Sequence, residues 1–260
     1  MRLTFLGTGT SFGVPVIGCT CAVCTSADPR DQRTRHAVVV ESDDGTRRIL
    51  VDTPPELRLQ LVRAGIARID AVWFTHCHAD HVHGIDDLRA FAMRPEYPLT
   101  AYADPECARV LTRKFDYIFD ASLRPLPGTS KPELHLEVYH DLQPVQVAGF
   151  DVLPLAVPHG TVQAYGFRIG DLGYITDAKS LPDHVVDALR GVKVLVLNAL
   201  WKGKPHPTHL TVEEAVATAA EIGAERTFLT HLSHRVRHAE LVDSLPPGVE
   251  PAYDGLTIEI

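Results

Sequence analysis

Residues 75–84, THCHADHVHG, contain the side chains best suited to chemistry in this 260-residue sequence. His76 and His78 follow an apolar run and are separated by one residue. In an extended chain their side chains face the same way, so both can bind one metal ion. Asp80 and His81 follow where the chain must turn, and they can reach a second metal ion beside the first. We therefore interpret this stretch as part of a site for two metal ions.

Four other apolar runs end in a potential metal ligand. Their terminal residues are Asp52, His159, Asp177 and His231. Loops at the same edge of a sheet converge in space, and α/β proteins build their sites there. The sequence therefore predicts a cluster of carboxylates and imidazoles at one sheet edge. This mixture of ligands suits a divalent cation such as zinc, manganese or iron.

The elements that would position these residues are mostly short strands. Apolar runs of strand type cover residues 2–8, 36–42, 47–53, 70–76, 99–104, 150–159, 164–170, 173–177, 192–199, 226–231 and 256–260. Helical patterns cover residues 55–65, 84–94, 104–115, 180–191 and 211–223. The last opens with Thr211 and Glu214 at capping-box spacing and closes on Gly223. We expect a layered α/β protein with mixed sheets, as a single domain over residues 1–260.

Composition narrows the possible partners. The net charge of −8 argues against broad nucleic-acid binding through a basic surface. No run of 18 apolar residues occurs, so we expect no transmembrane helix and no membrane partner. The first residues, MRLTFLGTGTSFG, lack the apolar region of a signal peptide, and we expect a cytoplasmic protein. Thiols stay reduced there, so clustered cysteines favour metal over disulfide.

The pattern His-x-His-x-Asp-His after an apolar strand is the signature of the metallo-β-lactamase fold superfamily. His159, Asp177 and His231 follow in the order that this superfamily uses. The sequence resembles a member along its whole length. The resemblance implies an αββα sandwich, in which two mixed β-sheets pack face to face with helices outside.

The same resemblance implies a dinuclear active site that binds zinc or manganese. The ligands would be His76, His78 and His159 for one ion and Asp80, His81 and His231 for the other, with Asp177 bridging both. Asp52 would orient the site through hydrogen bonds. Two such ions lower the pKa of a bridging water, which gives hydroxide near neutral pH. Asp80 and Asp177 would in this way belong to the catalytic machinery.

The spacing of the cysteines resembles that of one family within this superfamily. The opening LGTGTSFGVPVIGCTCAVC resembles the phosphodiesterase family of the carbon–phosphorus lyase pathway, which opens phosphoribosyl 1,2-cyclic phosphate. That family completes a three-cysteine structural zinc site with a histidine three residues after the last active-site histidine. The matching residues here are Cys19, Cys21, Cys24 and His234. Cys77 and Cys107 are competing ligands, but we expect a buried thiol at the first and a core residue at the second.

His209 is the expected general acid, or else a hydrogen-bond donor to the charge that develops on phosphorus. It lies two residues before Thr211, and it resembles the non-ligand histidine that phosphodiesterases and transfer-RNA-processing nucleases of this superfamily place over the metals. A leaving alkoxide needs a proton, which such a histidine would donate. A simple loop or capping role is the alternative. His206 stays unassigned, and the histidines without a partner pattern are expected to be ordinary: His36, His135, His140, His184 and His238.

The expected function is metal-dependent hydrolysis of a small cyclic or nucleoside-type phosphodiester. The alternatives are a transfer-RNA-processing nuclease, a lactone or thioester hydrolase, and a scaffold with a lapsed metal site. The nuclease needs a gripping arm and a basic surface, whereas the scaffold would lack some of the seven ligands. The resemblance also implies a homodimer. Residues 112–131 could form a lid, a substrate wall, a dimer contact or a surface excursion.

Overall fold

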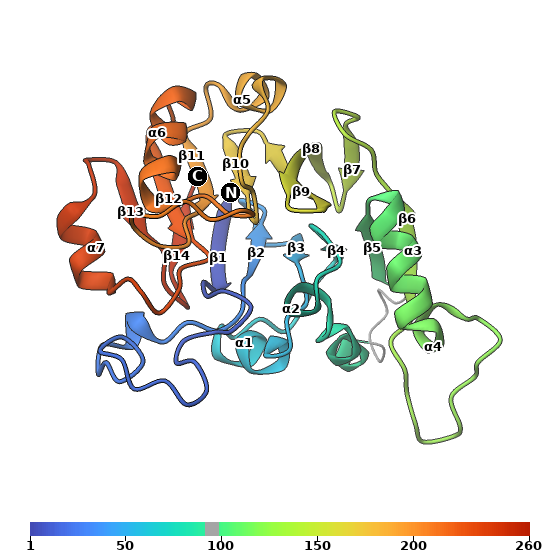
Figure 1. Ribbon diagram of the computed structural model, residues 1–260. Helices are drawn as coiled ribbons and strands as arrows, with labels where there is room; N and C mark the ends of the chain where they lie inside the picture. Colours follow the sequence, from blue (N-terminus) through green and yellow to red (C-terminus); the bar gives the residue numbers. More distant parts are fainter. Residues whose placement is uncertain (92–98) are drawn as a thin grey trace.

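The computed structural model describes residues 1–91 and 99–260. Over those residues the chain forms two seven-stranded sheets packed face to face (Figure 1). The first sheet has the order β14 (Thr257–Glu259), β1 (Arg2–Gly7), β2 (Ala37–Glu41), β3 (Arg48–Val51), β4 (Ala71–Trp73), β5 (Leu99–Ala103) and β6 (Leu134–Val138). The second has the order β13 (Val249–Pro251), β12 (Arg226–Thr230), β11 (Val194–Asn198), β10 (Leu172–Ile175), β9 (Val162–Ile169), β8 (Phe150–His159) and β7 (Val145–Val147).

Both sheets are mixed, and their parallel parts position the site. Strands β3 to β6 run parallel in the first sheet, and β10 to β13 run parallel in the second. The remaining neighbours in each sheet are antiparallel. The carboxyl ends of parallel strands lie at the same sheet edge, so the loops that follow them meet there. Asp52, Asp177 and His231 each follow such an end.

Helices cover the outer faces of the sheets, so the sandwich has four layers (Figure 1). They are α1 (Leu57–Arg63), α2 (Ala79–Val82), α3 (Pro105–Lys114), α4 (Asp116–Phe119), α5 (Asp183–Leu189), α6 (Val212–Ile222) and α7 (His238–Ser244). One buried cluster joins residues of both sheets, including Trp73 and Phe228. Two others pack the outer faces against helices, through Leu111 of α3 and Ile222 of α6. The expected αββα architecture is therefore confirmed.

Local sequence signals were sufficient to predict some of the helices and their ends. Helix α6 has the expected capping box, in which Thr211 accepts from the backbone of Glu214 and the Glu214 carboxylate accepts from the backbone of Thr211. It ends at Gly223, which adopts φ 78°. Part of the pattern at 84–94 becomes a 3-10 helix at Ile85–Phe91, and residues 92–94 lie outside the described residues.

The elements that the sequence did not predict are short. Three are edge strands, β6, β7 and β13, and three are helices, α2, α4 and α7. An edge strand has one exposed side and only a short apolar pattern, so pairing with its neighbour decides its structure. The stretch 112–131, whose role the sequence left open, covers the end of α3, α4 and most of a loop that projects from the body of the molecule before β6 (Figure 1). No helix in the described part of the chain is long and apolar enough to cross a membrane.

Candidate active site

Asp177 is the centre of the cluster that the strand ends create. One of its carboxylate oxygens, Oδ2, lies 3.3 Å from Nε2 of His81, and Oδ1 lies 3.3 Å from Nε2 of His231. Three further imidazoles approach Oδ2 through Nε2, those of His76 at 3.6 Å, His159 at 3.7 Å and His209 at 3.6 Å. These imidazoles come from strand ends and loops of both sheets and, for His81, from the short helix α2. One buried carboxylate therefore faces imidazoles from across the whole sandwich.

Three strand-end residues have an unusual backbone conformation. Asp52, Asp177 and His231 have φ angles of 64°, 57° and 58°. Non-glycine residues pay a conformational cost of about 1–3 kcal/mol in this left-handed region, and such residues cluster at functional sites. The conformation lies at or just after the end of each strand, and these side chains contact other members of the cluster. The same backbone device thus aims three of the predicted site residues.

The predicted metal ligands form two adjoining groups. His76, His78 and His159 form one group, and Asp80, His81 and His231 form another; within each group the potential ligand atoms lie within 4.8 Å of one another. His78 lies between its two partners, with Nδ1 at 3.0 Å from Nε2 of His76 and 3.3 Å from Nε2 of His159. Helix α2 carries Asp80 and His81 directly after the turn. The structure thus brings together both predicted groups.

Hydrogen bonds to Nδ1 fix the imidazole rings of two of these histidines. Nδ1 of His81 lies 2.7 Å from an oxygen of Asp52, and Nδ1 of His159 lies 3.0 Å from the carbonyl oxygen of Thr208. Both partners accept a hydrogen bond from Nδ1–H, so Nε2 of each ring faces the cluster. Asp52 is held in turn by the backbone N–H and the hydroxyl of Thr75. Asp52 therefore holds the His81 ring through a hydrogen bond, as the resemblance implies.

The electrostatics of the cluster favour a bound cation. Burial raises the pKa of Asp177, but His231 and His81 outweigh it and hold this pKa well below its usual value. Burial lowers the pKa of His81, but Asp177, Asp52 and Asp80 together raise it well above its usual value. Without a metal ion, the three carboxylates hold a proton on His81. A divalent cation can replace that proton and neutralise more of the negative charge.

The residues present fit a pair of divalent cations. Among the described residues, Nε2 of His81 and both ring nitrogens of His231 are buried with no hydrogen-bond partner. Leaving such atoms unpaired is costly, and a metal ion would satisfy the Nε2 atoms. Imidazole and carboxylate donors suit zinc and manganese. The seven predicted ligands would hold the two ions, with Asp177 between the groups.

His209 lies beside the cluster as predicted. Its ring stacks on that of His231 with centroids 4.7 Å apart, and it meets the ring of His159 edge-on at 4.8 Å. Nδ1 of His209 lies 2.8 Å from the hydroxyl of Thr208, whereas its buried Nε2 has no hydrogen-bond partner. His206, unassigned from sequence, lies next to it, with the two Nδ1 atoms 3.3 Å apart. His209 therefore presents a free nitrogen towards the centre of the site.

The sequence missed His36, which is not an ordinary histidine. Its side chain is 1% exposed and lies behind the cluster, with its ring centroid 6.3 Å from that of His231 and 6.5 Å from that of His81. Nε2 lies 2.5 Å from the hydroxyl of Tyr174, and Nδ1 lies 3.0 Å from that of Thr230. No local pattern links residues so distant in sequence. Only its position directly before a fully buried strand, β2, hinted at burial.

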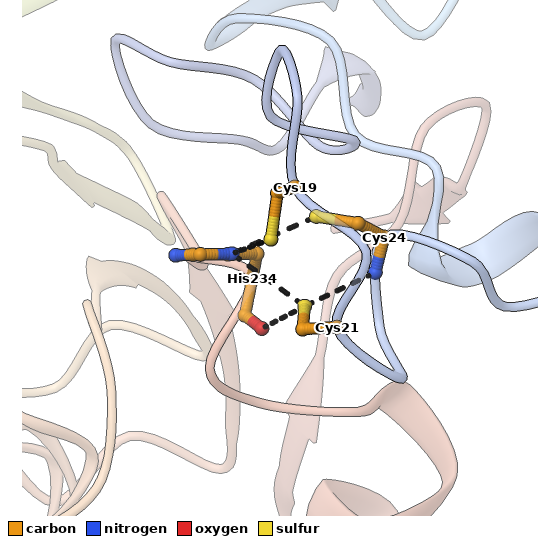
Figure 2. Close-up of side chains that lie close together, drawn as sticks. All are labelled: Cys19, Cys21, Cys24 and His234. Atoms are coloured by element: carbon orange, nitrogen blue, oxygen red, sulfur yellow. Dashed lines mark hydrogen bonds between the residues drawn. The ribbon is translucent and has the colours of Figure 1, made fainter.

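A second cluster contains the three clustered cysteines. Figure 2 shows Cys19, Cys21 and Cys24 arranged around His234, whose Nδ1 lies 3.3, 3.6 and 3.6 Å from their sulfur atoms. Ligands of a tetrahedral zinc ion lie roughly 3.6 Å apart, as bond lengths near 2.3 Å require. The pKa of Cys21 is lowered to about 6, chiefly by a hydrogen bond from the backbone of Cys24. The four predicted ligands therefore fit one zinc ion.

The remaining two cysteines require a correction. Cys77 is half-buried rather than buried, and it forms a disulfide with Cys107 across a separation of 30 residues. Cys107 is buried in α3 as expected. The sequence suggested a thiol at Cys77 because its side chain points away from the flanking histidines. That direction leads to α3, where Cys107 lies at bonding distance.

Comparisons with known proteins agree with this architecture. The family profile described as "Beta-lactamase superfamily domain" matches residues 47–232. An octanoyltransferase of Porphyromonas gingivalis is 41% identical over 98% of this chain, although the chain spans only 51% of that relative. A ribonuclease Z of Bradyrhizobium diazoefficiens is 27% identical over 92% of each chain.

A solved structure is similar over nearly the whole molecule. The crystal structure of a diphosphatase from the PhnP family superposes with a TM-score of 0.90 at 39% identity, covering 100% of this chain and 97% of that one. The sheet order, the cluster at the strand ends and these matches lead to one conclusion. The chain belongs to the metallo-β-lactamase superfamily, and among solved structures it resembles the PhnP family.

Proposed function

We propose that this protein is a dinuclear metal-dependent phosphodiesterase that hydrolyses a small cyclic or nucleoside-type phosphodiester. One observation carries the proposal: a free imidazole nitrogen of His209 faces a cluster of seven potential metal ligands. A carbonyl substrate with a good leaving group does not need such an acid, whereas a leaving alkoxide of a phosphodiester does. The similarity to a solved diphosphatase supports phosphorus chemistry.

The chain's own residues would divide the work. When bound, two divalent cations would supply a hydroxide near neutral pH and neutralise charge on the phosphoryl oxygens. Asp52 and the Thr208 carbonyl fix the ring orientation of His81 and His159. The Thr208 hydroxyl orients His209 through Nδ1. Nε2 of His209 would then donate a proton to the leaving oxygen.

Transfer-RNA processing is the second candidate, because the ribonuclease Z relative aligns over most of both chains. The net charge of −8 argues against it, since RNA binding relies on basic surface. The octanoyltransferase relative is about twice as long as the matched part. Its named activity is therefore not transferred to this chain.

A substrate panel tests the proposal. Protein loaded with manganese or zinc would be assayed with bis(p-nitrophenyl) phosphate, p-nitrophenyl phosphate, p-nitrophenyl acetate, a lactone and a precursor transfer RNA. We expect kcat/KM for the diester to exceed that for the monoester and the carboxylic esters at least about 100-fold. A preference for the monoester, an ester or the RNA would contradict the proposal. EDTA-treated protein serves as the control and should be inactive.

A further inference from the structure

A cavity of about 270 Å³ opens directly beside His209 and His231. Its other walls come from the N-terminal loop, through Phe12 and Val16, and from the segments after β11 and β12, through Trp201 and Arg235. Leu200 adds to this apolar and aromatic surface, and the remaining lining side chains are threonine, serine, histidine and arginine. A substrate whose phosphorus lies at the metal cluster would therefore extend part of its structure into this cavity.

Phe12 is exposed at this cavity without a structural reason. Its side chain is 72% exposed, although large aromatic residues normally bury most of their surface. It sits in a tight turn that the backbone N–H of Gly13 closes by donating to Thr10, 2.8 Å away. Gly13 adopts φ 64°, and the next residue pairs with Arg33 through two backbone hydrogen bonds. The turn thus holds an aromatic ring at the cavity.

Trp201 also lines the cavity, and three contacts fix its ring. The guanidinium of Arg235 lies 4.2 Å from the ring centroid, and the ring of His206 meets it edge-on at 5.1 Å. Its indole N–H donates to the carbonyl oxygen of Lys204, 2.8 Å away. Among the described residues, no carboxylate pairs with the guanidinium of Arg235. The cavity therefore has a fixed aromatic wall and an available cation at its rim.

Buried polar contacts hold the two walls together. Arg33, 1% exposed, donates to the carbonyl oxygens of Ser233 and Val236 at 2.9 and 3.0 Å, and it pairs with Asp31. The cysteines around His234 join the same two segments. The N-terminal loop and the segment after β12 are therefore joined at two places. Such a preformed cavity binds a ligand without the cost of ordering loops.

We propose that this cavity binds an aromatic heterocycle of the substrate, such as the base of a nucleoside phosphodiester, against Phe12 and Trp201. The inference rests on the proposed phosphodiesterase function, because it places the base beside the attacked phosphorus. A sugar phosphate without a base would leave Phe12 uncovered. Arg235 would contact polar atoms at the edge of the ring or a neighbouring phosphate. Stacking of one base on an aromatic side chain strengthens binding about tenfold to 100-fold.

The test compares two ligands that differ only by the base. Adenosine 5′-monophosphate and ribose 5-phosphate would be titrated into manganese-loaded protein by calorimetry. We expect the adenosine compound to bind at least about tenfold more tightly. Phe12→Ala should remove most of that difference and leave the affinity for ribose 5-phosphate unchanged. Ile17→Ala is the matched control, because Ile17 is 98% exposed on the same loop but does not line the cavity.

Several results would overturn the inference. These are equal affinities of the wild-type protein for the two ligands, failure of the adenosine compound to bind, and an equal loss for both ligands in Phe12→Ala. The outcome is separable from that of the proposed function, because binding is measured without turnover. If the protein hydrolyses diesters but shows no preference for the base, the proposed function is supported and the proposed base subsite is contradicted.

Discussion

At the scale of single residues, the energetically unfavourable features of this protein lie in the metal-ligand cluster. Asp52, Asp177 and His231 combine a left-handed backbone with burial, and neither is favourable alone. The surrounding strands hold these positions because each lies at the end of a buried, hydrogen-bonded strand. Once the strands are formed, the backbone conformation at their ends restricts the orientation of these three side chains. A rigid cluster follows, which is what two metal ions and one attacked phosphorus require.

His209→Ala tests the role of the free imidazole. The variant should keep both active-site metal ions and lose about 10²- to 10⁴-fold in kcat for a diester with an alkoxide leaving group. Elemental analysis and steady-state kinetics measure the two effects. His184→Ala is the control, because His184 is exposed and pairs with Asp141, which does not belong to the cluster. Loss of a metal ion in His209→Ala would show a ligand instead, since His209 lies within reach of His159 and Asp177.

The pH dependence of stability should report on His36. Burial, together with electrostatic interaction with His231 and His81, lowers the pKa of His36 from 6.5 to about 3. In the unfolded chain the His36 imidazole therefore binds a proton near pH 6.5, whereas in the folded protein it binds one only near pH 3. The folded state loses stability as pH falls through that window, by about 2 kcal/mol between pH 7 and pH 5.

Urea unfolding of metal-free protein at these two pH values measures the effect. His36→Gln should be less stable at pH 7, because Tyr174 and Thr230 lose a partner. It should nevertheless lose about 2 kcal/mol less than wild type on acidification. Equal losses in both proteins would contradict a neutral buried His36, because the other titrating groups are common to the two.

At the scale of elements, the loop after β4 depends on its neighbours. It carries four potential metal ligands, and the short helix α2 fixes two of them. The disulfide between Cys77 and Cys107 attaches this loop to the first turns of α3. Asp104 caps that helix by accepting from the backbone of Glu106 and Cys107. The ligand loop is therefore joined to an element that has its own local stability.

Breaking this disulfide should destabilise the protein. It closes a stretch of 30 residues, for which the chain-entropy estimate is about 3–4 kcal/mol. Thermal unfolding should shift to lower temperature when a reductant is added to wild-type protein. Cys107→Ser should unfold at that lower temperature with or without the reductant. A reductant response in Cys107→Ser would instead implicate the cysteines around His234, and an unchanged wild type would argue against the disulfide.

At the scale of the whole molecule, the cysteine cluster joins distant parts of the chain. His234 is 215 residues from Cys19, yet the two lie in contact, and His231 is only three residues before His234. The cluster thus connects the N-terminal loop to the segment that carries an active-site imidazole. It also fixes one wall of the cavity beside Phe12. A structural ion here would shape the active site without entering the chemistry.

Cys21→Ser tests this arrangement. The metal content of fully loaded protein should fall from three ions to two per chain, and the thermal midpoint should fall with it. The two ions at the histidine cluster should remain in the fraction that stays folded. Cys107→Ser, which leaves the cluster intact, should keep three. Full activity of wild-type protein with only two ions per chain would contradict a structural zinc site.

The sequence by itself determined the ligand types, their order and the strands that carry them. Five apolar runs ending in aspartate or histidine predicted the cluster, because strand ends at one edge must converge. The capping box of α6 is equally local. The pairing of His234 with the cysteines came from resemblance to a family, since no spacing rule links residues so far apart.

Only the tertiary structure decided which distant side chains meet. It placed His36 behind the cluster, joined Cys77 to Cys107, added the edge strands and formed the cavity between Phe12 and Trp201. Each of these depends on contacts between elements that are distant in sequence, within a sheet, between the sheets or between a sheet and a helix, and one sequence encodes those contacts through many weak apolar interactions. Periodicity reveals which face of an element is buried, but it does not reveal which other element covers that face.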